Sequence, residues 1–332
     1  MERAIIHSNL IKQEIQPSDL IKEYKSLLEK DIKKWLSPES MQKVFCPVTG
    51  EQEIKQSFSK IGMEYHISHS LGNIYLSPQP SMKALKTFYL KSEAREFWHT
   101  QLWPKTKAMR RKKIILPQLE WAQEFIGQYC AQESLKLAEY FPNHWGYFLA
   151  SKHIFPSDNY KMIDVLFDPV SAKESISENI GNEVPINSLD AALLFEALDR
   201  SPDPTGLLES VKQSLKPGGL CFITCLLSSG FEMQILGEKS DVFVPPERMN
   251  LFSFEGINRL IEKIDGFDIL EFSTPGVLDI PNVINKLEEV DNLNFFGYVF
   301  KLRDDPSMVV SFQDFLQRYR LGTFGRLVLR KK

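Results

Sequence analysis

Residues 189–219 decide the fold and read LDAALLFEALDRSPDPTGLLESVKQSLKPGG. The run 189–195 is short and apolar and leads into polar residues, which is typical of a buried parallel strand. Asp203 can cap the following helix, with Pro204 in its first turn. The Pro-Gly-Gly at 217–219 ends that helix, and another apolar run begins at once. Strand, helix and strand in this order form the repeating unit of a doubly wound α/β sheet.

Apolar runs alternate with helical stretches on both sides of this segment. The apolar runs predict further strands at 135–140, 162–167, 220–227, 267–273 and 324–330. Helical spacing predicts helices at 145–155, 171–180, 203–215, 254–264, 279–289 and 308–319. The alternation therefore predicts an α/β fold over residues 131–332, with a Rossmann-like, mostly parallel sheet whose last strand is antiparallel. Ligands of such sheets bind at the carboxyl ends of the strands.

An amphipathic helix is predicted in the N-terminal part, residues 1–40. Apolar residues recur at helical spacing over 18–36 with Lys and Glu between them, and Ser18 can cap the start. This helix must bury its apolar stripe, either on the main domain or on a partner protein.

Two further segments precede the sheet and give the protein a small N-terminal α+β region. Residues 41–80 alternate in the manner of strands and predict a small β-hairpin unit. Residues 81–130 are helical and rich in aromatic side chains, and we expect Pro104 and Pro117 to break this connector into pieces.

The composition is that of an ordinary globular protein, with 43% hydrophobic and 25% charged residues. A net charge of −3 argues against a nucleic-acid-binding protein, and the one basic block, 110–113, favours a solvated helix face over a phosphate-binding patch. Four irregularly spaced cysteines imply no disulfide framework, which fits a cytoplasmic location. No apolar run approaches the roughly 20 residues of a membrane span, and no signal peptide is expected.

The sequence of residues 189–219 resembles the corresponding segment of class I S-adenosylmethionine-dependent methyltransferases. In that family the fourth strand ends in a Phe-Glu-type stretch and leads through Asp-Pro to Leu-Lys-Pro-Gly-Gly before strand five. Five further stretches resemble a bacterial subgroup linked to surface-polysaccharide and modified-sugar biosynthesis. They are CPVTG at 46–50, IYLSPQP at 74–80, NLFS at 250–253, STPGVLD at 273–279 and FQDFL at 312–316. The resemblance covers roughly residues 44–331. It implies a seven-stranded methyltransferase sheet, S-adenosylmethionine as cofactor, and a sugar or nucleotide-sugar as substrate.

The loop that would hold the cofactor departs from the family pattern. The family places an Asp/Glu-x-Gly-x-Gly-x-Gly turn after the first strand, where glycines let the backbone approach the cofactor. Here residues 137–149 read LAEYFPNHWGYFL, which keeps only Gly146 and fills the turn with bulky side chains. We therefore expect S-adenosylmethionine to bind weakly or not at all.

Four residues are the cofactor-binding candidates that the resemblance implies. His144 and Gly146 lie in the altered loop, and Phe195 ends the fourth strand. Asp168 follows the second strand, where an acid of the family accepts hydrogen bonds from the ribose hydroxyls. Capping of a helix before Pro169 is an equally good explanation of Asp168.

The candidate catalytic bases are Glu196, Asp199 and Glu247. Relatives usually carry Glu-His where this chain has Asp199-Arg200, and a His where it has Arg248, and Arg cannot accept the proton that a neutral His would take. The resemblance places Arg248 and Asn250 on the substrate side. The alternative is that the three carboxylates are solvated loop residues.

We expect no metal ion in the N-terminal region. Relatives carry two Cys-x-x-Cys pairs there that would hold zinc. The first pair is reduced to Cys46, and His66 and His69 bring the possible ligands to three, whereas structural zinc takes four. The hairpin unit is therefore interpreted as zinc-ribbon-like with the metal lost.

Three functions remain open from the sequence. The protein could be a methyltransferase acting on a sugar or nucleotide-sugar. It could be a non-catalytic pseudoenzyme that serves as partner or scaffold for another biosynthetic enzyme. It could also be a binding module that holds a different small ligand in the former cofactor cleft.

Overall fold

The computed structural model describes residues 5–6, 8–130, 134–142, 144–155, 160–163, 180–181, 183–290 and 306–332. Its main sheet has seven strands in the order β12-β13-β10-β9-β6-β7-β8. The strands are β6 (Leu137–Tyr140), β7 (Tyr160–Ile163), β8 (Ile180–Gly181), β9 (Leu189–Phe195), β10 (Leu215–Leu226), β12 (Phe267–Ser273) and β13 (Phe324–Lys331). Strands β10, β9, β6, β7 and β8 pair in parallel, whereas β13 pairs antiparallel with both β10 and β12. The predicted Rossmann-like sheet with an antiparallel last strand is confirmed.

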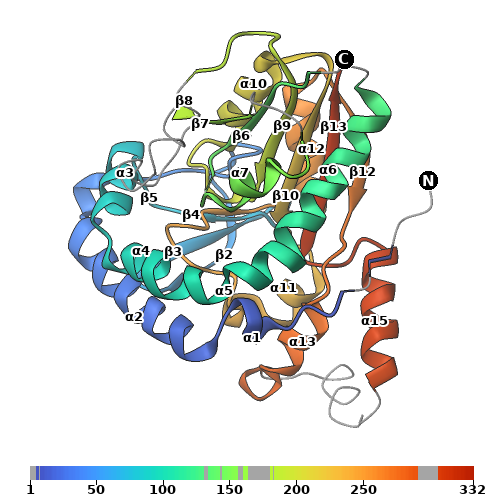
Figure 1. The fold of residues 1–332 in the computed structure, drawn as a ribbon. Helices are drawn as coiled ribbons and strands as arrows, with labels where there is room; N and C mark the ends of the chain where they lie inside the picture. The colour runs from blue at the N-terminus through green and yellow to red at the C-terminus, as the bar shows by residue number, and fades with distance from the viewer. Residues whose placement is uncertain are drawn as a thin grey trace.

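The sheet forms because its central strands are apolar on both faces. Every residue of β9 is buried. Alternate residues of β9 face opposite sides, so Leu193 packs with Trp121 of α6 (Leu116–Tyr129), whereas Leu194 packs with Leu208 of α10 (Pro204–Ser214). Figure 1 shows α6 lying across one face of the sheet. Helices on both faces are what a doubly wound sheet requires.

The main domain contains further helices among its described residues. They are α7 (Gly146–Ser151), α9 (Ala197–Arg200), α11 (Phe231–Leu236), α12 (Phe254–Ile264), α13 (Asp279–Ile284) and α15 (Pro306–Arg318). Asp203 caps α10 as expected, since its Oδ1 accepts a hydrogen bond from the Gly206 amide at 2.9 Å. The predicted helix over 171–179 and the second half of the strand predicted at 162–167 lie outside the described residues.

The N-terminal amphipathic helix is α2 (Ser18–Trp35), and it packs inside this chain. Its stripe, including Leu28 and Ile32, joins the main hydrophobic core and lies against α3 (Met82–Lys91) and α4 (Glu93–Phe97). The stripe is therefore not available to a partner protein. The predicted Ser18 cap is wrong, because the helix begins at Ser18 itself after Pro17, and the Ser18 amide donates a hydrogen bond to Gln13 Oε1 at 3.1 Å.

The hairpin unit is part of a four-stranded antiparallel sheet. It comprises β2 (Ile54–Lys60), β3 (Met63–Ser68) and β4 (Ile74–Leu76), and β11 (Asn250–Leu251) adds to its edge. A short ladder between β1 (Met41–Gln42) and β5 (Gln79–Pro80) closes the unit. Because β11 comes from the second half of the main domain, this pairing fastens the N-terminal region to the large sheet.

The expectation that Pro104 and Pro117 break the connector is wrong. Pro104 is the second residue of α5 (Trp103–Arg110), and Pro117 is the second residue of α6. A π-helical turn precedes each of these helices, Trp98–Leu102 and Arg111–Ile115, and the flanking backbone stays in the right-handed helical region. A π turn changes which carbonyl each amide meets, so a proline without an amide can be passed without ending the helix.

Candidate functional site

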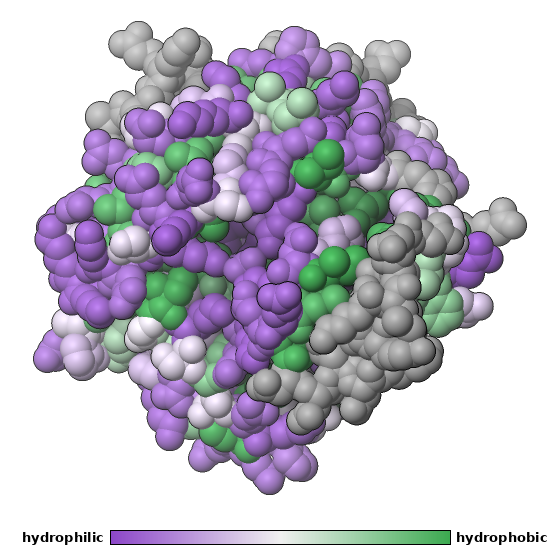
Figure 2. Space-filling model, turned by 90° about the horizontal axis from the view of Figure 1, so that it is seen from below, coloured by the Kyte–Doolittle hydropathy of each residue, from purple (hydrophilic) through white to green (hydrophobic). Residues whose placement is uncertain are grey.

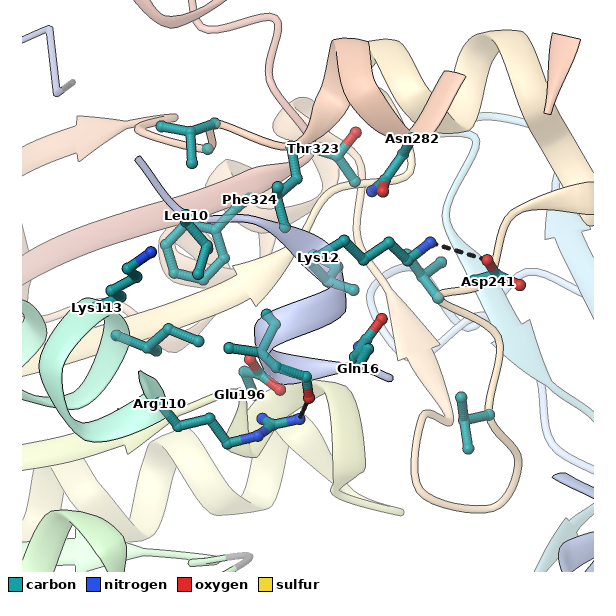
Figure 3. Close-up of a pocket in the computed structure, with 18 of the residues that line it drawn as sticks. Leu10, Lys12, Gln16, Arg110, Lys113, Glu196, Asp241, Asn282, Thr323 and Phe324 are labelled. Atoms are coloured by element: carbon teal, nitrogen blue, oxygen red, sulfur yellow. Dashed lines mark hydrogen bonds and ion pairs between the residues drawn. The ribbon is translucent and has the colours of Figure 1, made fainter. Parts of the chain in front are cut away.

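A cavity of about 1010 Å³ lies at the carboxyl ends of β6 and β9. This is the end of a doubly wound sheet at which ligands bind. Figure 3 shows side chains reaching it from three sides: Arg110 and Lys113 from α5 and the following turn, Lys12 and Gln16 from the N-terminal segment, and Asp241 and Asn282 from the opposite wall. Seen from below, this side of the molecule carries mostly hydrophilic residues (Figure 2).

Glu196, a candidate base, follows β9 and is held by arginines. Its backbone is left-handed, with φ of 55°, and its amide donates to the Thr224 carbonyl at 2.8 Å. Its Oε2 accepts a hydrogen bond from Arg248 Nη2 at 2.7 Å and lies 3.9 Å from Arg200 Nη1. Burial raises the pKa of Glu196, but the guanidinium groups of Arg248 and Arg200 outweigh it, so the pKa lies below its ordinary value. An ionised, arginine-paired carboxylate is a weak proton acceptor.

Asp199, the second candidate base, is fully buried beneath Arg248. Its Oδ2 accepts hydrogen bonds from Arg248 Nη1 at 2.8 Å and from the Leu226 amide at 3.0 Å. In the part of the chain that is described, its Oδ1 has no hydrogen-bond partner. Burial raises the pKa of Asp199 to about 7, against the lowering effect of Arg248. Asp199 therefore changes charge near neutral pH.

The third candidate base and the two candidate substrate residues also have internal partners. Glu247 Oε1 accepts a hydrogen bond from Arg95 Nη1 at 3.2 Å. Arg248 bridges the two carboxylates Glu196 and Asp199. Asn250 is buried and donates from Nδ2 to the carbonyls of Leu198 and Ser201, so it fixes the turn after β9 and does not face the cavity. The expectation that the carboxylates are solvated loop residues is wrong for Asp199, which is fully buried.

His144 lies in the altered loop after β6, where the family pattern has glycines. Its ring stacks on Trp103 with centroids 4.5 Å apart and lies parallel to Tyr147 at 5.5 Å. Its Nδ1 accepts a hydrogen bond from the Gly146 amide at 3.0 Å. A Cβ added at Gly146 would lie 2.7 Å from Ile115 and 2.8 Å from His144, so this glycine is needed for internal packing. Burial, reinforced by Arg110 and Arg200, lowers the pKa of His144 to about 3, so the ring is neutral.

Arg200 forms hydrogen bonds with the ends of two central strands. Its Nη2 donates to the Phe141 carbonyl at 2.7 Å and to the Phe195 carbonyl at 3.1 Å. Phe141 follows β6 and Phe195 ends β9, so the guanidinium lies between the strand ends that flank the cavity. Phe195 itself lines the cavity, and its ring lies 4.6 Å from that of Tyr147. Asp168, the remaining cofactor candidate, lies outside the described residues.

Sequence reasoning missed Glu139 as a site residue. It is the third residue of β6, one position before the end of that strand, where the family pattern has an acid close by, a signal that the sequence contained. Its side chain lines the cavity and accepts a hydrogen bond from the Tyr160 hydroxyl at 2.9 Å. Burial raises its pKa to about 8, which keeps this carboxyl largely protonated at neutral pH.

The basic block at 110–113 was also misjudged as a solvated face. Arg111 and Lys112 are exposed, but Arg110 and Lys113 line the cavity. Arg110 Nη2 donates to the Ile15 carbonyl at 2.6 Å, and Lys113 Nζ donates to the Asn9 carbonyl at 2.8 Å. These bonds hold the segment around the short helix α1 (Lys12–Ile15) across the cavity, and nothing in the sequence pattern pointed to this crossing.

No group of three or more metal-ligating side chains was found among the residues with a described position. Cys46 is buried, and its Sγ accepts a 3.5 Å hydrogen bond from Asn73 Nδ2. The absence of zinc remains a prediction. In the described part of the chain, no helix is long and apolar enough to cross a bilayer.

The sheet topology and a match to a family model support a methyltransferase-like Rossmann fold. Residues 121–271 match the family model described as "Methyltransferase domain". Among solved structures, a putative sarcosine dimethylglycine methyltransferase from Galdieria sulphuraria is 18% identical over 65% of this chain and 86% of that chain, with a TM-score of 0.39. A possible histamine N-methyltransferase from Thermotoga maritima is 16% identical over 71% of this chain and 100% of that chain, with a TM-score of 0.40.

A third solved structure is a complex between the Haloferax volcanii Trm112 methyltransferase activator and a putative methyltransferase. It is 14% identical over 69% of this chain and 96% of that chain, with a TM-score of 0.41. At these identities the likeness concerns the fold alone. A search of curated proteins found no match.

Proposed function

We propose that this protein keeps the methyltransferase fold without methyl transfer from S-adenosylmethionine, and that its cavity binds another small polar ligand. The observation that carries the proposal is the position of His144. Its ring stacks on Trp103 and Tyr147 where glycines of the family leave room for the cofactor. Neither His144 nor Gly146 offers the open backbone that the cofactor would need, so the described residues do not fit it.

The state of the candidate bases supports the same proposal. Glu196 is ionised and paired with Arg248, and Glu247 is paired with Arg95. Asp199 does not line the cavity. A general base must come within about 3 Å of the atom whose proton it removes and must be free to accept that proton. Glu196 and Glu247 line the cavity but are each paired with an arginine, and Asp199 has no access to the cavity.

The cavity itself supports ligand binding. Its volume of about 1010 Å³ is at the upper end of the range for small-molecule sites, which is on the order of 300 to 1,000 Å³. Its walls carry both ammonium groups and carboxylates. We propose a sugar or nucleotide-sugar as the ligand class, on the resemblance of the sequence to methyltransferases of sugar biosynthesis.

Calorimetry with S-adenosylmethionine and S-adenosylhomocysteine tests the loss of the cofactor site. We expect dissociation constants no tighter than about millimolar, which corresponds to roughly −4 kcal/mol. We also expect Asp168→Ala to change this weak binding little. Micromolar binding that Asp168→Ala weakens about tenfold would overturn the proposal.

An active methyltransferase is the second candidate. It is favoured by the family match over 121–271 and by the pKa of Asp199 near 7, which suits a base at neutral pH. This candidate predicts methyl transfer from labelled S-adenosylmethionine to a sugar or nucleotide-sugar, and loss of that transfer in Asp199→Asn. The first candidate predicts no transfer above the rate without protein.

A further inference from the structure

Three lysines converge on one carboxylate at the wall of the cavity opposite Glu196. Asp241 Oδ2 lies 2.9 Å from Lys12 Nζ, and its Oδ1 lies 2.9 Å from Lys25 Nζ and 3.0 Å from Lys286 Nζ. All four residues line the cavity. Figure 3 shows Lys12 extended across the cavity toward Asp241. We call these four residues the lysine cluster.

The lysine cluster carries more positive charge than it neutralises. Within the cluster, one carboxylate balances only one of the three ammonium charges. Glu232 also lines the cavity and interacts with Lys12, but burial raises the pKa of its carboxyl, and its oxygens already accept hydrogen bonds from Ser240 and Asn282. The carboxylate of Glu289 lies 3.8 Å from Lys286, but it is 58% exposed and so contributes little through water. Lys60 adds a fourth ammonium nearby: burial first, and then the charges of Lys286 and Lys25, lower its pKa. The charges therefore repel one another in a partly buried place, where screening is weak.

The geometry of the cluster is that of an anion site. The lysine side chains are between 17% and 27% exposed, so they are neither free in water nor sealed in the core. Each ammonium has three N–H donors, and the bonds to Asp241 use one donor of each lysine. Lys286 uses a second donor on the Lys239 carbonyl at 2.7 Å. The remaining donors can serve a ligand with several acceptor oxygens.

Anchoring of the N-terminal segment does not explain the cluster. A single bond from Lys12 to Asp241 would fasten α1 to this wall. Lys25 and Lys286 also attract Asp241, but one carboxylate is already balanced by one ammonium, so each added lysine mainly adds repulsion among the ammonium groups. Those two residues come from α2 and from the turn after α13, which are already held by their own packing. The excess charge is therefore a feature of the cavity.

We infer that the lysine cluster binds a phosphate or diphosphate group in the cavity. A phosphate group carries about two negative charges at neutral pH and three strong acceptor oxygens, which match the two uncompensated ammonium charges. Lysine binds phosphate as a point charge, so no bidentate geometry is required. The inference rests on the proposed function, because both place a small polar ligand in the same cavity, and it assigns the anionic end of that ligand.

The test is calorimetry at constant ionic strength, with inorganic phosphate, pyrophosphate and uridine diphosphate titrated into the full chain. Pyrophosphate is expected to bind with one site per chain, and the double substitution Lys25→Gln with Lys286→Gln is expected to weaken it at least tenfold. Lys30→Gln is the matched control, since Lys30 lies on α2 with an exposed side chain and should change the affinity less than twofold. Tighter binding of uridine diphosphate than of pyrophosphate would identify a phosphate ester as the ligand, and equal binding would identify a free inorganic anion.

A second variant tests the inference independently, in case the double variant does not fold. Asp241→Asn removes the competing carboxylate and leaves every lysine in place, so pyrophosphate should bind severalfold more tightly than to the wild type. If Asp241 and the lysines served only as an anchor, Asp241→Asn would bring no gain in affinity. Wild-type protein that does not bind pyrophosphate, or Asp241→Asn protein that binds it more weakly, overturns the inference. Tight binding of S-adenosylmethionine would instead overturn the proposed function and leave the anion site untouched.

Discussion

Arg248 Nη2 lies 2.7 Å from Glu196 Oε2, and this ion pair joins the end of β9 to the loop that leads into β11. The loop carries β11 into the small sheet, so the pair connects the large sheet with the N-terminal region. The same guanidinium reaches Asp199. One arginine thus organises two of the carboxylates that sequence reasoning offered as bases, and it does so by neutralising them.

Glu196→Gln should lower the free energy of unfolding by about 1 to 3 kcal/mol at pH 7, since it leaves Arg248 and Arg200 with less compensating charge. The pKa of Glu196 is lowered from its ordinary value of 4.5, so its contribution is present above that pH and is lost on further acidification. Urea unfolding at pH 7 and pH 3 measures this, and the difference in stability between the two proteins should be smaller at pH 3 than at pH 7. Glu29→Gln, in an exposed pair with Lys33, should have no measurable effect at either pH.

Asp199→Asn should remove part of the pH dependence of stability. The folded carboxyl has a pKa of about 7 against an ordinary value of 3.8, so between these pH values the unfolded chain binds fewer protons than the folded one. Wild-type stability therefore falls as the pH rises from 4 to 7, with a ceiling of about 4 kcal/mol for this group. Urea unfolding of both proteins at pH 4.5 and 7.5 measures the difference.

Glu139 also makes the free energy of unfolding fall with rising pH, because its pKa is raised to about 8. This effect is present in wild type and in Asp199→Asn, so only the difference between their pH slopes reports on Asp199. Asn in place of the exposed Asp268 is the control and should keep the wild-type slope. An Asp199→Asn protein with the full wild-type slope would contradict the burial of a titrating acid at this position.

The fold could be predicted closely because its signals are local. The helix at 254–264 and the strand at 267–273 have the expected bounds, since a 3.6-residue apolar period and a short apolar run identify each without tertiary information. Asp203 as a cap is likewise a local signal. Pro104 and Pro117 misled the prediction because the π turns before them depend on helix packing that the sequence does not display.

The site was predictable only in part. Glu196, Asp199 and Arg248, which the sequence offered as candidates, are in contact in the structure. Their pairing could not be read from the sequence, because Arg248 is 52 residues from Glu196 and either partner could have faced solvent. The crossing of residues 8–16 over the cavity had no signal, because this segment is short. Its contacts are hydrogen bonds to backbone carbonyls and ion pairs of Lys12 and Glu14 with residues far away in the sequence.

His144→Ala should destabilise the protein by about 2 to 3 kcal/mol. The substitution removes the ring between Trp103 and Tyr147 and leaves a cavity in the loop, and each aromatic pair contributes about 0.5 to 1.5 kcal/mol beyond the loss of buried area. Burial lowers the pKa of His144 to about 3, so the wild type also loses stability as the pH falls below about 6.5, and the variant should lose less. Thermal unfolding at pH 7 and pH 5 tests both statements, with the exposed His153→Ala as control.

Arg110→Gln should release the N-terminal segment from the cavity without unfolding the domain. Arg110 Nη2 donates to the Ile15 carbonyl at 2.6 Å, and a hydrogen bond from a charged donor contributes about 1.5 to 3 kcal/mol. The segment is otherwise held by a few bonds, from Lys113 to the Asn9 carbonyl and to Glu14, and from Lys12 to Asp241. Loss of the arginine should therefore raise the local opening rate of residues 8–16 by a factor of about ten or more.

Hydrogen exchange of these amides, followed by mass spectrometry, measures the opening, while the amides of β9 and β10 report on the domain. The neighbouring Arg111→Gln removes the same charge from an exposed position and should leave the exchange of 8–16 unchanged. Equal acceleration in the two variants would mean that net charge, and not the bond to Ile15, keeps the segment across the cavity.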